Sequence, residues 1–123
     1  MISEILRNPH GPAAGRMGEE SGEIITSIIV LAELRFGLTE SPSARRSKLV
    51  DRLLESLPVV DWAHPAETKY GEIRAELERR GMPIGGNDLL IAAHALALDA
   101  TLVTANEREF RRVPGLRIEN WIV

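Results

Sequence analysis

Asp88 is a single acid at the predicted start of an apolar helix, a position where it could cap the helix or belong to a site. It follows the turn-forming segment Pro83–Asn87 and opens the apolar run Leu89–Leu98. Asp is a favoured N-cap, and an acid at a helix N-terminus gains about 0.3–1 kcal/mol from the helix dipole. Asn87 beside it would cap equally well. Asp88 is therefore either a helix cap or an acid that is free to belong to a site.

Glu33 is the second acid of interest, because it shares one side of a predicted helix with apolar residues. Its neighbours three and four positions away are Ile29, Val30, Phe36 and Gly37. A lone carboxylate among apolar groups is costly unless it is paired or binds a metal. An ion pair with Arg35 or another base explains Glu33 as well as a metal site does.

The third acidic group, Asn106, Glu107 and Glu109, follows the predicted strand Thr101–Thr104. A solvated polar turn accounts for at least one of these residues. In open α/β sheets, however, sites form at the carboxyl ends of the strands, and this turn lies there.

Carboxylates gathered from separate elements repel one another unless a cation lies between them. The chain has no cysteine, and a site of hard oxygen ligands alone suits magnesium or manganese. Such a metal can polarise a phosphodiester and activate water. The acids therefore indicate metal-assisted hydrolysis of a nucleic acid, and they do not distinguish RNA from DNA.

Basic residues could contact the phosphates of such a substrate. Arg108, Arg111 and Arg112 adjoin the acidic turn and are the candidates for substrate binding. A second cluster is formed by Arg45, Arg46, Lys48 and Arg52. A solvated helix face explains either cluster equally simply.

His94 follows Asp88 by six residues, which is about 120° around a helix, so the two side chains do not share a face. We expect His94 to be a core or interface histidine.

The length and composition fit one domain with a modest core. The chain has 123 residues, of which 44% are hydrophobic and 27% charged. No run approaches the ~18 apolar residues that a membrane span needs. The absence of cysteine suits a reducing cytoplasm, where we expect the protein to work. A net charge of −3 gives no global sign of nucleic-acid binding.

Strands and helices alternate along the chain, which predicts an α/β sandwich with parallel strands. Strands are expected over residues 23–26, 58–62, 101–104 and 117–121. Helices are expected over residues 2–6, 28–36, 41–57, 65–80 and 88–98. Ser27 is the predicted N-cap of the helix 28–36, and Gly37 its end.

Three segments together resemble the PIN-domain nucleases. Residues 26–37 resemble the second conserved block of that family, and residues 83–98 resemble the third. Thr101–Thr104, with Glu109-Phe110 and residues 113–116, resembles the fourth. The resemblance runs over nearly the whole chain and is nearest to the VapC-type toxins of bacterial toxin–antitoxin pairs, in the FitB and NtrR-like branch.

The resemblance implies a single PIN-like domain over residues 1–123, a three-layer sandwich with a mainly parallel central sheet. It implies a magnesium-dependent endoribonuclease in which Glu33 and Asp88 bind the metal and Glu33 helps to position the attacking water. The fourth acidic position falls at Asn106 or Glu107. It also implies a homodimer, a VapB-like antitoxin that blocks the site, and contact with operator DNA only through that antitoxin.

One departure from the family is serious. Its members open with an apolar strand that ends in Asp-Thr-Asn, whereas this chain starts at Met1, directly after the expected place of that motif. The resemblance therefore implies that the first strand and its metal-binding Asp are absent. Either the start is misassigned or truncated, or the protein is a degenerate module that only binds its antitoxin and regulates its operon. Retention of Glu33 and Asp88 favours the first explanation.

Overall fold

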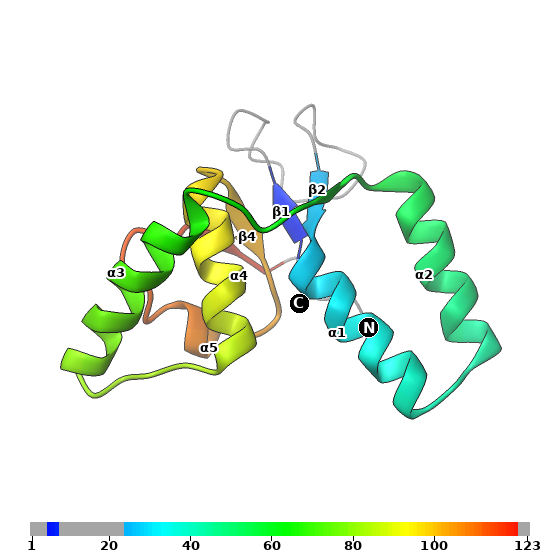
Figure 1. Cartoon of the computed structure of the whole chain (residues 1–123), viewed down its shortest axis with the longest axis horizontal. Helices are drawn as coiled ribbons and strands as arrows, with labels where there is room; N and C mark the ends of the chain where they lie inside the picture. The colour runs from blue at the N-terminus through cyan, green and yellow to red at the C-terminus, as the bar shows by residue number, and fades with distance from the viewer. Residues whose placement is uncertain (1–4, 8–23, 121–123) are drawn as a thin grey trace.

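The computed structural model describes residues 5–7 and 24–120, and it has an α/β architecture. Five strands form a sheet in the order β3-β2-β1-β4-β5. The strands are β1 (Ile5–Arg7), β2 (Ile24–Ser27), β3 (Val59–Val60), β4 (Thr101–Val103) and β5 (Ile118–Glu119). Figure 1 shows helix α4 in front of the sheet, between α3 and α1, with α2 standing beside α1.

The sheet is mixed rather than mainly parallel. β2 pairs with β3, and β4 with β5, in parallel, as predicted. β1 lies between β2 and β4 and runs antiparallel to both. The register places Ile5 opposite Val103, so the amino end of β1 lies at the sheet edge where β4 ends.

The helix predicted over residues 2–6 is wrong at Ile5 and Leu6, which belong to β1; residues 2–4 lie outside the described part of the chain. A helix of five residues is unstable by itself in water. In the sheet, by contrast, Leu6 has strand partners on both sides, opposite Ile25 of β2 and Leu102 of β4.

The helices are α1 (Ile28–Glu40), α2 (Ala44–Ser56), α3 (Ala66–Arg79), α4 (Gly86–Ala97) and α5 (Glu107–Phe110). Ser27 caps α1 as predicted, because its Oγ accepts a hydrogen bond from the Ile29 amide at 3.0 Å. The predicted end at Gly37 is wrong: α1 continues to Glu40, and the Ser41 amide donates to the Gly37 carbonyl. The helix stops before Pro42, which disfavours helical geometry in the residue preceding it.

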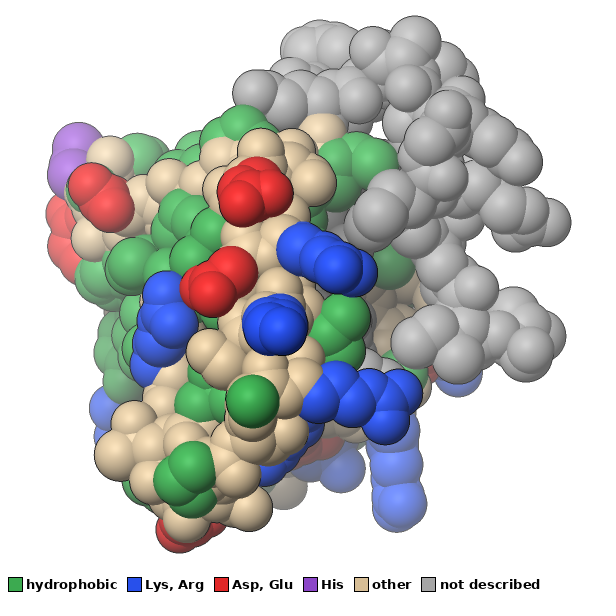
Figure 2. All heavy atoms as spheres, turned by 90° about the vertical axis from the view of Figure 1, so that its right-hand side faces the viewer, with side chains coloured by type: hydrophobic (Ala, Val, Ile, Leu, Met, Phe, Trp, Pro, Cys, Tyr) green, Lys and Arg blue, Asp and Glu red, His purple; other side chains and the backbone are tan. Residues whose placement is uncertain are grey.

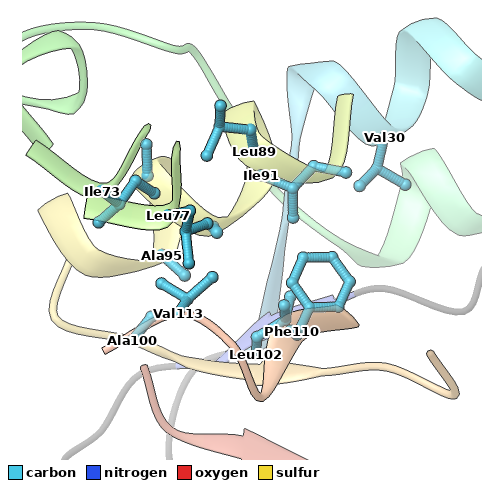
Figure 3. Packing of buried hydrophobic residues seen from close by; sticks show 12 residues of the cluster. Val30, Ile73, Leu77, Leu89, Ile91, Ala95, Ala100, Leu102, Phe110 and Val113 are labelled. Atoms are coloured by element: carbon cyan, nitrogen blue, oxygen red, sulfur yellow. The ribbon is translucent and has the colours of Figure 1, made fainter. Parts of the chain in front are cut away.

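The core lies between α4, α3 and β4 (Figure 3). Leu77, Ile91, Leu102 and Phe110 are fully buried there. Residues Ile91–Ala95 of α4 are all buried, which confirms the prediction of an almost wholly apolar helix. In the described residues no helix has the length and apolar character needed to cross a membrane.

Candidate active site

Asp88 lies in the first turn of α4, but it is not the cap of that helix. The N-cap is Gly85, and no side chain supplies a capping hydrogen bond. The Leu89 amide instead bonds to the Gly85 carbonyl at 2.9 Å, so the N-cap lies three residues before Asp88. The capping interpretation of Asp88 is therefore wrong, and its partly buried carboxylate is available to a site while it still faces the positive end of the helix dipole.

Asp88 meets two residues that follow β4. The side-chain amide of Asn106 donates to Asp88 Oδ2 at 3.3 Å and to Glu109 Oε2 at 3.2 Å. The other oxygen of Glu109 accepts from the Gly85 backbone amide at 3.1 Å. Thr104 fixes the turn, because its Oγ1 accepts from the Asn106 amide at 3.0 Å. The start of α4 and the segment after β4 therefore form one acidic cluster.

The pKa of the Glu109 carboxyl lies below its ordinary value. The largest cause is a hydrogen bond with Asp88; the Gly85 amide, the Asn106 side chain and the charge of Arg112 act in the same direction, against partial burial. The carboxyl groups of Asp88 and Glu109 therefore lie close together, and the Asn106 side chain bonds to both.

Glu33 reaches this cluster through Asn87. The exposed Glu33 carboxylate on α1 accepts a hydrogen bond from Asn87 Nδ2 at 3.1 Å, and Asn87 directly precedes Asp88. Within the part of the chain that the structure describes, no ion pair joins Glu33 to Arg35 or to another base. The hydrogen bond therefore links α1 to the start of α4 at the site.

A buried contact also joins these two helices. His94 Nδ1 on α4 lies 2.8 Å from Ser27 Oγ, the cap of α1. His94 is 1% exposed, which confirms that it is a core histidine. Burial lowers its pKa, and the nearby Asp61 opposes this by a smaller amount. The contact fixes the helix that carries Glu33 against the helix that carries Asp88.

The structure places Glu107 away from the acidic cluster. Its carboxylate accepts from Asn120 Nδ2 at 2.9 Å and pairs with Arg111 at 3.0 Å, and both contacts lower its pKa. Glu109, one helical turn after Asn106, meets Asp88 instead. Sequence reasoning considered Glu109 but did not select it; the three-residue spacing from Asn106, which brings two side chains to one face of a helix, was the available signal.

Of the three arginines predicted to bind substrate, only Arg112 has contacts among the described residues that connect it to the acidic cluster. Arg112 donates to the Pro83 carbonyl at 2.9 Å and lies close enough to Glu109 to lower the pKa of that carboxyl. Arg111 is paired with Glu107, and Arg108 is exposed. The other predicted cluster lies on α2, where Figure 2 shows basic, acidic and hydrophobic side chains mixed on the face nearest the viewer.

The donor set can be compared with the needs of a metal ion. Among the described residues, no group of three or more His, Cys, Asp or Glu side chains is close enough to hold one. Mg²⁺ retains several waters, however, and is commonly held by one or two carboxylates. Asp88 and Glu109 supply two carboxylates in contact, and Asn106 supplies a neutral oxygen. These residues fit a magnesium ion in number and chemistry.

The PIN-domain family matches residues 2–116, which is most of the chain. The chain belongs to the PIN-domain family. Within that family it belongs with the VapC toxins of VapBC toxin–antitoxin systems, to which it is similar over most of its length.

Two relatives illustrate this similarity. Ribonuclease VapC2 of Rickettsia felis is 46% identical over 103 residues, which cover 83% of this chain and 77% of the relative. The tRNA(fMet)-specific endonuclease VapC of Shigella flexneri is 36% identical over 117 residues, which cover 94% of this chain and 89% of the relative.

The fold is also that of solved VapC structures. The structure of VapBC2 from Rickettsia felis bound to a DNA fragment from its promoter superposes with a TM-score of 0.76 and 46% sequence identity. The match covers 80% of this chain and 74% of that one. The PIN fold expected from the sequence is thereby supported, although β1 runs antiparallel to its neighbours.

Proposed function

We propose that this PIN-domain protein is a magnesium-dependent endoribonuclease toxin of a VapBC-type module. The observation that carries the proposal is the contact of Asp88, Asn106 and Glu109, three residues from two segments of the family's conserved blocks. The similarity to VapC ribonucleases supports RNA rather than DNA as the substrate.

In this proposal Asp88 and Glu109 hold the Mg²⁺ ion, and Asn106 orients both carboxylates. The ion, when bound, polarises the scissile phosphodiester and lowers the pKa of a bound water. Mn²⁺ has the same preference for oxygen ligands and can replace Mg²⁺.

Glu33 acts on water rather than on Asp88 directly. Its carboxylate is exposed and is oriented by Asn87, so it can bind the metal through water and accept a proton from the attacking water. Glu107, held by Asn120 and Arg111, supports the turn from outside the cluster. Arg112 contacts the phosphate next to the acids, and Arg108 and Arg111 contact more distant phosphates.

The proposal is tested with Asp88→Asn, which keeps the shape of the side chain and removes its charge. We expect Mg²⁺-dependent cleavage of RNA to fall at least 100-fold, because the metal loses one of two direct ligands. Asp51→Asn, an exposed acid on α2, is the matched control and should cleave like the wild type. Equal cleavage by Asp88→Asn and the wild type would overturn the assignment.

A second function is favoured by one observation: among the described residues, no group of three or more His, Cys, Asp or Glu side chains lies close enough to hold a metal ion. A catalytically inactive PIN module that binds its antitoxin and regulates its operon would need no complete metal site. Calorimetric titration of the 123-residue chain with Mg²⁺ separates the two functions. Saturable binding that Asp88→Asn abolishes, together with RNA cleavage, excludes the inactive module.

The proposed partners are a VapB-like antitoxin and a second copy of the chain. The solved relative is itself a complex of toxin, antitoxin and promoter DNA, and we propose that operator DNA is reached through the antitoxin. The hairpin of α1 and α2 offers apolar surface to a protein partner, since Phe36 is 65% exposed and Leu49 is 54% exposed.

A further inference from the structure

A cavity of about 260 Å³ lies beside the start of α4, where Gly86 and Leu89 line it. It is formed by α3, the loop after α3 and the first turn of α4. Its lining residues are Tyr70, Arg74, Leu77, Glu78, Pro83, Ile84, Gly86 and Leu89. The volume lies just below the range of about 300–1,000 Å³ that is typical of pockets for drug-sized ligands, so it suits a smaller planar group.

The floor and the rim of the cavity differ in chemistry. Leu77 and Leu89 are buried and give it an apolar floor. At the rim, Arg74 donates to the Tyr70 hydroxyl at 2.9 Å and to Glu78 Oε2 at 3.0 Å. These contacts hold the guanidinium, which lies 5.8 Å from the centre of the Tyr70 ring. The cavity lining therefore combines a guanidinium and an aromatic ring with buried apolar side chains.

This combination suits a nucleobase. Unstacked RNA bases stack on aromatic rings and on arginine guanidinium planes, and they are recognised by hydrogen bonds to their edges. The Arg74 guanidinium has five N–H donors, of which two serve Tyr70 and Glu78. Glu78 has a second carboxylate oxygen, which can accept a hydrogen bond from an exocyclic amine such as that of cytosine or adenine.

The cavity is also placed where a base of a cleaved strand would lie. Gly86 lines it, and Asp88 is two residues further along the chain, so their Cα atoms are at most about 7.6 Å apart. Arg112 binds the carbonyl of Pro83, another lining residue, and its charge acts on Glu109. Arg112 thus links a residue that lines the cavity to the acidic cluster, and its positive charge is available to a phosphate there.

We propose that the cavity between α3 and the start of α4 binds one base of the RNA strand next to the cleaved phosphodiester, and that Arg74 and Glu78 favour a base with an exocyclic amine. The inference rests on the proposed ribonuclease function. It makes Arg74 and Glu78 determinants of RNA preference rather than catalytic residues.

The test measures binding in the absence of divalent cations, so that the RNA stays intact. Fluorescence anisotropy gives the affinity of hexacytidylate and hexauridylate for the wild-type chain and for Arg74→Ala. Arg79→Ala is the matched control: it lies on the same helix, is exposed like Arg74 and removes the same charge. Nonspecific attraction to phosphate therefore falls equally in both variants.

We expect Arg74→Ala to weaken hexacytidylate binding about tenfold, since one stacked base contributes that much or more, and Arg79→Ala to change it less than twofold. The wild type should bind hexacytidylate more tightly than hexauridylate, and Glu78→Gln should reduce that preference. In NMR spectra, the methyl signals of Leu77 and Leu89 should shift as RNA is added.

Equal losses in Arg74→Ala and Arg79→Ala, or unmoved methyl signals, would overturn the inference. Methyl shifts that follow protein concentration without RNA would show that a second copy of the chain fills the cavity instead, and would also overturn it. If these outcomes occur while the wild type still cleaves RNA and Asp88→Asn does not, the proposed function stands. A protein that neither binds nor cleaves RNA would remove both.

Discussion

At the residue scale, the site depends on two carboxyl groups that touch. Asn106 bonds to both Asp88 and Glu109, so the two carboxylates lie close enough to repel each other, and a cation between them would relieve this repulsion. The Gly85 amide and the Asn106 side chain hold Glu109 in place. Each of these contacts comes from main chain or from a neutral side chain, so none of them cancels the negative charge that a cation needs.

Glu109→Gln tests this arrangement. The amide oxygen can still accept from Gly85, but the charge is lost, so we expect affinity for Mg²⁺ and the rate of RNA cleavage each to fall at least tenfold. Glu107→Gln is the matched control two residues away, and its effect should stay below threefold because Glu107 faces Asn120 and Arg111. Calorimetry and a cleavage assay measure the two effects. A larger loss in Glu107→Gln than in Glu109→Gln would contradict the assignment of Glu109, rather than Glu107, to the metal site.

The sequence indicated which acids to examine, and the structure decided between neighbours. Glu107 and Glu109 have the same side chain and lie in the same turn, and only the direction of α5 separates them. The predicted capping role of Asp88 was wrong for a similar reason. The sequence offered two good capping residues, and the chain used Gly85, which has no side chain to signal it.

At the element scale, α1 and α4 must keep a fixed relation, because one carries Glu33 and the other Asp88. Ser27 and His94 make that connection in the core. Ser27 serves two elements at once: its Oγ caps α1 and contacts the imidazole of α4. The capping function could be predicted from the local sequence, whereas the contact across 67 positions could not.

Ser27→Ala should therefore cost more than the loss of an ordinary cap. Removing a capping hydroxyl costs about 1 kcal/mol, and leaving a buried imidazole nitrogen without a partner costs about 1–3 kcal/mol more. Ser43→Ala is the control, since Ser43 caps α2 at a partly exposed site and should cost only about 1 kcal/mol. Urea unfolding monitored by circular dichroism gives both free energies. Equal losses in the two variants would show that the Ser27–His94 contact adds no stability.

At the scale of the whole molecule, the sheet contains one strand, β1, that the local sequence pattern did not predict. The strands β2, β3, β4 and β5 and their parallel pairings follow from the alternation of helices and strands. β1 does not, because a short apolar segment is compatible with the end of a helix or with a strand, and its direction depends on its partners β2 and β4, of which β4 lies near the other end of the sequence. The order of the sheet places the ends of β2 and β4 on either side of β1.

The stability of this whole assembly should depend on pH through His94. Its pKa is lowered in the folded protein, so as the pH falls the unfolded chain binds a proton on His94 before the folded protein does. Above the ordinary pKa of about 6.5, the free energy of unfolding is therefore unaffected by this proton. Below that pH it decreases, by at most about 1.4 kcal/mol per pH unit. Asp61, the charged group near the imidazole, moderates the decrease.

Urea unfolding between pH 7.5 and 5.5 measures this dependence. His64→Ala is the control, because His64 is exposed and paired with Glu67, and this variant should retain the decrease attributed to His94. His94→Gln should lose it. Should His94→Gln fail to fold, the imidazole signals of His94 in NMR spectra of the wild type provide the test: the ring should gain its proton only at a pH below the ordinary pKa of about 6.5. A ring that becomes protonated at or above pH 6.5 in the folded protein would refute this source of pH dependence.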